Sequence, residues 1–149
     1  MTPLAQLQAI NTRINRVPAR DDLDNYGTDD HWATPREFFR NGGDCEDYAI
    51  AKYAALERLG WPAERMWIVV LRETVISLIH AVLMVEYDGR LWTLDNLGDG
   101  IFVHGQIDYY RPAYSLNRFG RWSHGTASAA LAGNRATGPG GPLIGCRRP

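Results

Sequence analysis

Three residues whose side chains can cooperate in nucleophilic catalysis occur in the order Cys45, His80 and Asp95. A cysteine thiolate can attack a carbonyl carbon, a histidine can take up the thiol proton, and an acid can hold the imidazole in the required tautomer. Such an attack forms an acyl-enzyme, which water or an amine then resolves. These residue types therefore predict acyl-transfer chemistry, provided that the surrounding elements bring them together.

The segment that carries Cys45 has the pattern of a helix. It begins at Asp44 or Cys45, directly after the turn Gly42-Gly43, and it ends at Gly60, with Pro62 following. Its apolar residues recur at helical spacing and form one face: Ala49, Ile50, Tyr53, Ala54 and Leu56. The pattern therefore places the cysteine in the first turn of a helix.

The position of Cys45 favours a reactive thiol. The positive end of a helix dipole stabilises a thiolate, whereas structural cysteines prefer apolar surroundings. The backbone N–H of Cys45 is also suited to donate to an oxyanion, and Trp32 is a candidate neighbour of the second donor or, equally, a core residue. A buried structural thiol is the alternative interpretation of Cys45.

His80 lies inside an apolar segment, residues 79–87, that predicts a strand, and residues 90–94 predict the next strand. The pair Asp88-Gly89 between them is typical of a two-residue hairpin turn. A histidine in an apolar strand is ordinarily a core residue whose hydrogen bonds are satisfied. The register of the hairpin tests whether His80 has a further role.

That register brings Asp95 near His80. With a two-residue turn, Tyr87 faces Arg90, and Asp95 then lies opposite Val82, on the sheet face that also carries His80. Diagonal neighbours on one face have Cβ atoms roughly 7–8 Å apart, which an imidazole and a carboxylate can span. Asp95 could instead be a simple turn former, but the register favours its pairing with His80.

The N-terminal part of the chain predicts two more helices. Apolar residues at three- and four-residue spacing predict a short helix within residues 2–20, and the polar residues 21–35 predict a loop. Thr34, followed by Pro35 and Glu37, has the pattern of an N-cap, a first helical residue and a capping-box acid. This second helix is short, because the glycine turn before Cys45 ends it.

The C-terminal part predicts strands and then a tail. Residues 66–71 predict a strand, and residues 101–124 predict another strand with a packed extension. Five aromatic residues in this part are predicted to pack in the core or at a sheet edge rather than to line a groove: Tyr109, Tyr110, Tyr114, Phe119 and Trp122. Residues 125–149 contain six Gly, three Pro and no acids, and they predict a disordered tail after one domain of residues 1–124.

The charge is unevenly distributed. The 149 residues carry a net charge of −1, but the segment from Asp21 to Asp47 holds nine acids against only Arg36 and Arg40. With 45% hydrophobic and 22% charged residues, the composition excludes a chain disordered throughout, a collagen and a coiled coil. The absence of a basic stripe excludes a general nucleic-acid-binding surface. The acidic segment therefore needs another explanation.

Three acids adjoin the cysteine: Asp44, Glu46 and Asp47. Each could be an ordinary first-turn acid, since helix N-termini favour Asp and Glu. Together, however, they disfavour a thiolate by raising the pKa of the Cys45 thiol. A cation would offset this field, and hard oxygen ligands indicate Ca²⁺ rather than zinc. We therefore predict a calcium site at the nucleophile.

Two further features concern the cellular context. The chain has two cysteines, too few for a disulfide scaffold, and we predict that Cys45 does not pair with Cys146 because the latter lies in the predicted tail. Residues 1–6 lack the basic and apolar regions of a signal peptide. The apolar stretch 78–85 is too short to cross a bilayer. The sequence as written thus predicts no standard export.

Four blocks of the sequence resemble the bacterial transglutaminase-like cysteine peptidases. The blocks are Trp32–Phe38, Gly42–Tyr53, His80–Leu83 and Leu94–Leu97. The resemblance covers roughly residues 10–124 in the correct order, and the block around the cysteine is specific. It implies an α+β fold with a papain-like or transglutaminase-like core, in which the nucleophile helix packs on an antiparallel sheet.

The resemblance also implies a function. It assigns the catalytic triad to Cys45, His80 and Asp95, and a calcium site to Asp44 and Glu46, with Asp47 nearby. The best-studied members are periplasmic proteases that clip large surface adhesins and are controlled by a membrane receptor. We therefore expect a cysteine endopeptidase acting on an exposed protein segment, periplasmic by resemblance or cytoplasmic by the missing signal peptide. The alternatives are an amide transferase or deamidase, and a catalytically silent calcium-binding module.

Overall fold

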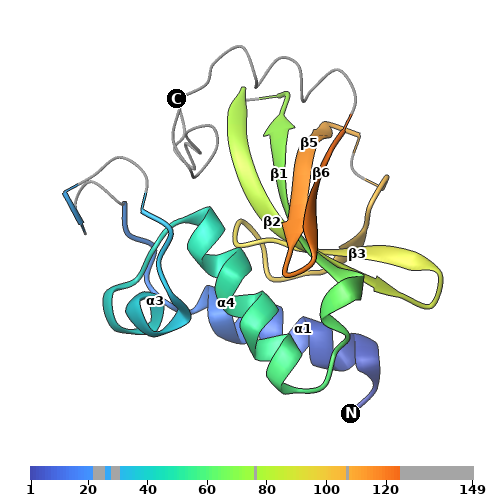
Figure 1. Cartoon of the computed structure of the whole chain (residues 1–149), viewed down its shortest axis with the longest axis horizontal. Coiled ribbons are helices and arrows are strands. Elements are labelled where there is room, and N and C mark those ends of the chain that lie inside the picture. Colours follow the sequence, from blue (N-terminus) through green and yellow to red (C-terminus); the bar gives the residue numbers. More distant parts are fainter. Residues whose placement is uncertain (22–25, 28–30, 76, 107, 125–149) are drawn as a thin grey trace.

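The structure is a computed structural model in which residues 1–21, 26–27, 31–75, 77–106 and 108–124 are described. The described helices are α1 (Pro3–Asn15), α3 (Pro35–Asn41) and α4 (Cys45–Arg58), followed by a 3₁₀ turn, Ala63–Arg65. The strands are β1 (Met66–Glu73), β2 (Leu78–Tyr87), β3 (Arg90–Leu94), β4 (Phe102–Val103), β5 (Tyr110–Asn117) and β6 (Gly120–Ser123). The predicted α+β class is confirmed (Figure 1).

Local sequence signals account for the helix ends. The predicted capping box of α3 is present: Glu37 N–H donates to Oγ1 of Thr34, and Oε1 of Glu37 accepts from the Thr34 N–H, both at 3.2 Å. Helix α1 ends at Asn15, within the predicted span of residues 2–20. It does not continue because Pro18 disfavours the helical conformation of Val17.

The strands form one antiparallel sheet in the order β4-β3-β2-β1-β5-β6. The turn Asp88-Gly89 joins β2 to β3 with φ values of 52° and 69°. Two positive φ angles are what a type I′ hairpin requires. Tyr87 pairs with Arg90, and Leu83 pairs with Leu94, so the predicted register is confirmed.

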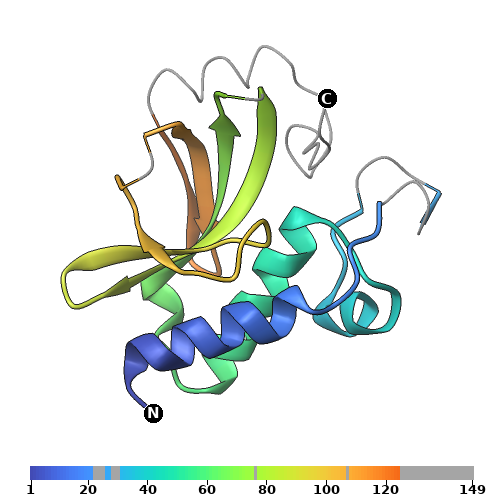
Figure 2. The same ribbon diagram turned by 180° about the vertical axis from the view of Figure 1, so that it is seen from behind.

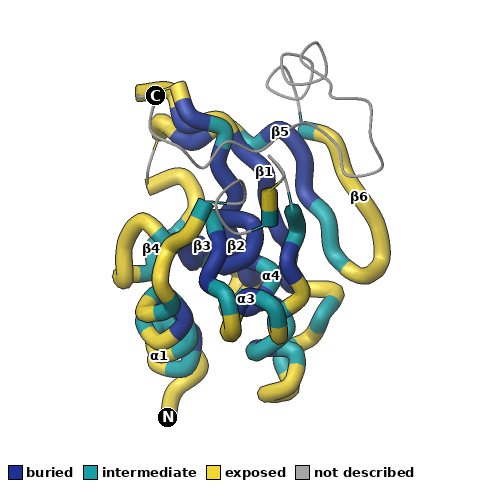
Figure 3. The backbone as a smooth tube through the Cα atoms, turned by 90° about the vertical axis from the view of Figure 1, so that its left-hand side faces the viewer, coloured by how far each residue is buried: buried dark blue, intermediate teal, exposed yellow. Residues whose placement is uncertain are grey.

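The helices cover one face of the sheet. Helix α4 packs on β2 and β1, and α1 packs on α4 and β3 (Figures 1 and 2). The core between these layers consists of buried side chains from both: Leu7, Ala49, Tyr53, Leu56, Met66, Ile68, Leu83, Val85 and Leu94. Strands β1 and β2 are mostly buried, whereas β6 is exposed at the edge (Figure 3). The N-terminus of α4 is thus held against the most buried strands.

The other face of the sheet carries a groove of about 1080 Å³, lined partly by Trp67, Met84, Arg111 and Trp122. Of the aromatic residues predicted to pack in the core or at an edge, Tyr110 and Tyr114 are buried, and Trp122 lies in the edge strand β6, where it also lines this groove. Within the described residues, no helix combines the length and apolar character needed to cross a membrane.

The segment after residue 100 differs from its prediction. It forms three strands instead of one strand and an extension, because β5 pairs with β1, which is distant in the sequence, and then turns back as β6. Residues 101–124 carry no clear alternation that would predict these pairings. The predicted tail, residues 125–149, lies outside the described residues.

Candidate active site

Two glycines shape the turn that leads into α4. Gly42 has a φ of 74°, in the region that favours glycine. At Gly43, a Cβ atom would lie 2.4 Å from Oδ2 of Asp47, so only glycine leaves room for that carboxylate. The N–H of Arg20 donates to the carbonyl of Gly43 (2.8 Å) and ties the turn to the chain before it. The glycine pair therefore sets the position of Cys45.

Cys45 is the first residue of α4 and is only 1% exposed. It packs in a cluster with Ala81, the residue after His80 in β2, and Trp32 packs against the same cluster. Its Sγ lies 3.6 Å from Oε2 of Glu46. The sulfur thus lies at the positive end of the α4 dipole and beside the strand that carries His80.

The predicted absence of a bond between Cys45 and Cys146 lies outside the described residues, because Cys146 is not among them. The chemistry proposed below uses the reduced thiol of Cys45, since the thiolate is the nucleophile.

His80 and Asp95 are in direct contact, as the hairpin register predicts. Nε2 of His80 lies 2.7 Å from Oδ1 of Asp95. His80 is 0% exposed and Asp95 is 3% exposed, so water competes little for this hydrogen bond.

The Asp95 carboxylate accepts two further hydrogen bonds. The hydroxyl of Tyr110 donates to Oδ2 (2.6 Å), and the N–H of Leu97 donates to Oδ1 (3.0 Å). Burial by itself would raise the pKa of Asp95, but the hydrogen bond and charge of His80, together with these two donors, hold the pKa below its ordinary value. Asp95 is therefore an ionised acceptor.

This acceptor determines the tautomer of His80. Because a carboxylate only accepts hydrogen bonds, Nε2 is assigned as the protonated ring nitrogen. Nδ1 is then the basic nitrogen; it is buried and makes no hydrogen bond to the residues that the structure describes. The ring is thereby prepared to take up a proton at Nδ1.

The sequence analysis assigned no role at the site to Tyr110 or Lys52. Tyr110 lies in β5, and only the pairing of β5 with β1 brings it to Asp95. Lys52 is 1% exposed in α4, two turns after Cys45. Burial lowers the pKa of Lys52 to about 7, and the charges of Asp95 and Asp99 oppose this shift. A lysine on the buried face of a helix was the available signal, since buried lysines need a compensating partner.

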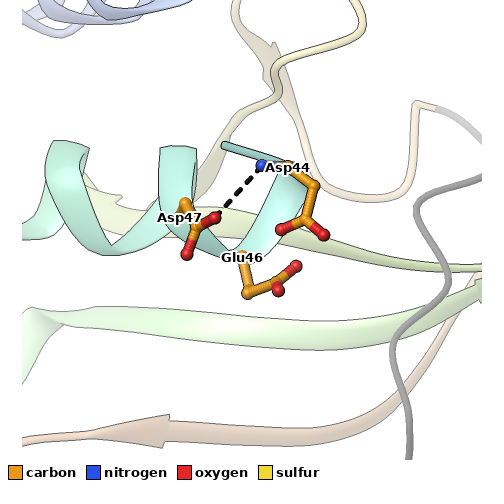
Figure 4. Close-up of side chains that lie close together, drawn as sticks. All are labelled: Asp44, Glu46 and Asp47. Atoms are coloured by element: carbon orange, nitrogen blue, oxygen red, sulfur yellow. Dashed lines mark hydrogen bonds between the residues drawn. The ribbon is translucent and has the colours of Figure 1, made fainter. Parts of the chain in front are cut away.

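The three acids near Cys45 gather at the start of α4 (Figure 4). One carboxylate oxygen of each of Asp44, Glu46 and Asp47 lies within 4.8 Å of the others. Asp47 is fixed by two backbone donors, the N–H of Ala33 (2.7 Å to Oδ1) and the N–H of Asp44 (3.1 Å to Oδ2). Glu46 and Asp47 are each 0% exposed, so water screens these acids little where they adjoin Cys45.

The electrostatics of this cluster fit a cation. Burial raises the pKa of Glu46 to about 12, and its hydrogen bond to Asp44 and the charges of Asp44 and Asp47 add to the rise. Carboxylate oxygens are the ligands that Ca²⁺ prefers, whereas zinc favours His and Cys. The donor set is therefore suited to hold Ca²⁺.

Comparison with known families identifies the family of this chain. The chain belongs to the bacterial transglutaminase-like cysteine proteinases (BTLCP), a family that matches residues 1–126. The match includes every described residue, with Cys45, His80 and Asp95 among them. No curated protein matches the chain.

Solved structures of Legionella pneumophila LapG are similar to this chain. One is 31% identical, covers 80% of this chain and has a TM-score of 0.71. An EGTA-treated form is 31% identical over 83% of this chain, with a TM-score of 0.73. A calcium-bound form is 28% identical over 88% of this chain, with a TM-score of 0.71. The chain spans 66%, 68% and 80% of these three structures, respectively.

Proposed function

We propose that this protein is a calcium-dependent cysteine endopeptidase that cleaves an exposed protein segment through an acyl-enzyme on Cys45. The observation that carries the proposal is the buried hydrogen bond between His80 and Asp95 in the sheet on which the helix that begins with Cys45 packs. Membership of the cysteine proteinase family supports the reaction class. Cys45, His80 and Asp95 are the proposed nucleophile, base and orienting acid.

In the proposed reaction, Nδ1 of His80 takes the proton of the reduced Cys45 thiol while Sγ attacks the scissile carbonyl carbon. The protonated Nδ1 then gives this proton to the leaving amine, and a thioester remains on Cys45. Nδ1 then deprotonates a water molecule that attacks the thioester carbonyl; the C–S bond breaks, the carboxylic acid leaves, and the proton on Nδ1 returns to Sγ. Asp95 stabilises the imidazolium through Nε2 in both halves of the reaction. The N–H of Cys45, the first of α4, is the proposed oxyanion donor.

Asp44 and Glu46, with Asp47, are the proposed calcium ligands. Ca²⁺ would supply positive charge that offsets the field of these acids and so lowers the pKa of the Cys45 thiol. The existence of a calcium-bound LapG structure supports this assignment, since that protein is similar to this chain.

The proposed substrate is an extended segment of a protein such as a large surface adhesin, and the proposed regulator is a membrane receptor. Both follow from the family resemblance of the four sequence blocks. The family membership supports a protein substrate in general terms.

Alkylation tests the activation of the thiol. The protein is reduced, desalted and exposed to iodoacetamide at neutral pH with Ca²⁺, and labelling of Cys45 and Cys146 is followed by mass spectrometry. We expect Cys45 to react much faster than Cys146, and we expect His80→Ala to slow the labelling of Cys45 but not that of Cys146. His104→Ala, at an exposed histidine, is the matched control. Equal labelling of both cysteines would contradict an activated thiol.

Peptide cleavage tests the reaction itself. The reduced protein is incubated with a peptide library prepared from a digested proteome, and new termini are identified by mass spectrometry. We expect cleavage that needs Ca²⁺ and is abolished in Cys45→Ala. Incorporation of a tagged primary amine at glutamine side chains, without new termini, would instead indicate amide transfer. Calcium binding with neither product would indicate a silent module.

A further inference from the structure

Asp95 lies just beyond the hydrogen-bonded ladder of the sheet. The ladder between β2 and β3 ends at Leu94, and the next strand begins only at Phe102. Residues 95–101 are all described and belong to no strand. The strand ladder therefore does not hold the main chain of this loop, in which Asp95 contacts His80.

A row of amide side chains on α1 meets this loop. Gln8, Asn11 and Asn15, here called the amide row, are three and four residues apart and so share one helix face. Nδ2 of Asn15 lies 2.9 Å from the carbonyl oxygen of Asp95 and 3.1 Å from Oδ1 of Asp99. Asn15 thus contacts the main chain of the very residue that orients His80.

The other two amides hold the far end of the same loop. Nδ2 of Asn11 donates to the carbonyls of Gly98 (3.1 Å) and Asp99 (2.8 Å). Nε2 of Gln8 donates to the carbonyl of Asp99, and its Oε1 accepts from the N–H of Ile101 (3.2 Å). The amide row therefore contacts the loop from its first residue to its last.

We propose that the amide row positions Asp95 for catalysis, with Asn15 as the positioning residue that acts most directly. The proposal rests on the proposed function of Asp95, and it assigns α1 a part in the active site without contact with substrate. Packing of α1 alone would be served by its apolar residues, such as Leu7 and Ile14, which are buried.

A structural role and a positioning role predict opposite orders of damage for substitutions at two members of the amide row. Asn11 is 0% exposed, whereas Asn15 is partly exposed. A merely structural role would make Asn11→Ala the more damaging change, because it leaves more buried groups unpaired. A positioning role makes Asn15→Ala the more damaging change at His80, although Asn11→Ala lowers the melting temperature more.

The experiment measures His80 directly. Reduced, ¹⁵N-labelled protein is prepared as wild type, Asn15→Ala, Asn11→Ala and Arg13→Ala, the last at an exposed α1 position as control. We expect two well-separated ring ¹⁵N shifts for His80 in the wild type, reporting one tautomer. In Asn15→Ala these two shifts should approach each other, and alkylation of Cys45 should slow on the order of tenfold. Arg13→Ala should change neither.

Unchanged His80 shifts in Asn15→Ala, or a larger change in Asn11→Ala than in Asn15→Ala, would overturn the proposal. If Asn15→Ala does not fold, Asn15→Gln displaces the same amide by one methylene and is compared in the same way. The shifts do not depend on activity. The two proposals can therefore fail separately. If the wild type neither alkylates rapidly nor cleaves peptides, the proposed function is rejected. A change of the His80 shifts in Asn15→Ala would still support the positioning role.

Discussion

The buried carboxylate of Asp95 and the acid cluster at Cys45 differ in how their charge is compensated. Asp95 is surrounded by donors, and its pKa is held below the ordinary value by His80, Tyr110 and a backbone N–H despite burial. Glu46 is surrounded by other acids, and burial with those acids raises its pKa to about 12. The difference shows that the fold itself completes the environment of Asp95 but leaves the environment of Glu46 suited to a cation.

The first test replaces the carboxylate of Asp95, which accepts hydrogen bonds from several donors. Asp95→Asn should lower the rate of peptide cleavage on the order of 10³- to 10⁴-fold, because an amide favours the wrong tautomer of His80. Calcium affinity should not change, since Asp95 is not among the three clustered acids. Cleavage rates and calorimetric titration of the same sample measure both quantities. An Asp95→Asn protein that retains cleavage would remove Asp95 from the triad.

The second test concerns the acid cluster at Cys45 and measures how the stability of the calcium-free protein depends on pH. Because the pKa of Glu46 is raised from 4.5 to about 12 in the folded state, the folded protein keeps a proton that the unfolded chain loses above pH 4.5. The contribution of Glu46 to stability is therefore full below pH 4.5 and declines as pH rises toward 12. We expect the free energy of unfolding to fall by up to about 1.4 kcal/mol per pH unit.

Urea unfolding in EGTA from pH 5 to 8 measures this slope. Glu46→Gln should remove it, as should saturating Ca²⁺ in the wild type. Glu64→Gln, at an exposed acid, is the control and should leave the slope in place. Equal slopes for the wild type and Glu46→Gln would show that Glu46 is not the group that titrates.

The third test measures calcium affinity. Glu46→Gln and Asp44→Asn should each weaken Ca²⁺ binding on the order of tenfold or more, since affinity depends on the number of charged ligands. Calorimetric titration of the reduced protein checks this, with Glu64→Gln again as the control. Unaltered affinity in both variants would place calcium elsewhere.

The smallest expected effect concerns Tyr110. Tyr110→Phe removes one of the donors to Asp95 (2.6 Å) but leaves His80 and Leu97 in place. The loss of one hydrogen bond is worth about 1 kcal/mol, so we expect cleavage to fall about fivefold. The exposed Tyr109 provides the matched control, Tyr109→Phe. A fall as large as that of Asp95→Asn would mean that Tyr110 has a direct chemical role.

Much of the local structure could be predicted because its causes are local. The capping box at Thr34, the glycine turn before Cys45 and the hairpin turn at Asp88 each depend on residues within a few positions of one another. The hairpin also predicts the contact of His80 with Asp95, because a turn of known length determines which residues face each other. The acids at Cys45 are neighbours in sequence, so their clustering required no long-range information.

The chemistry of the site was thus largely determined by the sequence alone: a cysteine at a helix N-terminus, a histidine and an acid paired by a hairpin, and acids beside the thiol. Only the tertiary structure decided what holds Asp95 in place. Tyr110 reaches it through the pairing of β5 with β1, and Asn15 reaches it through the packing of α1 beside β3. These contacts join residues about 15 and 80 positions apart, and no turn or helical period relates them. They exist because burial of the shared core brings the elements together.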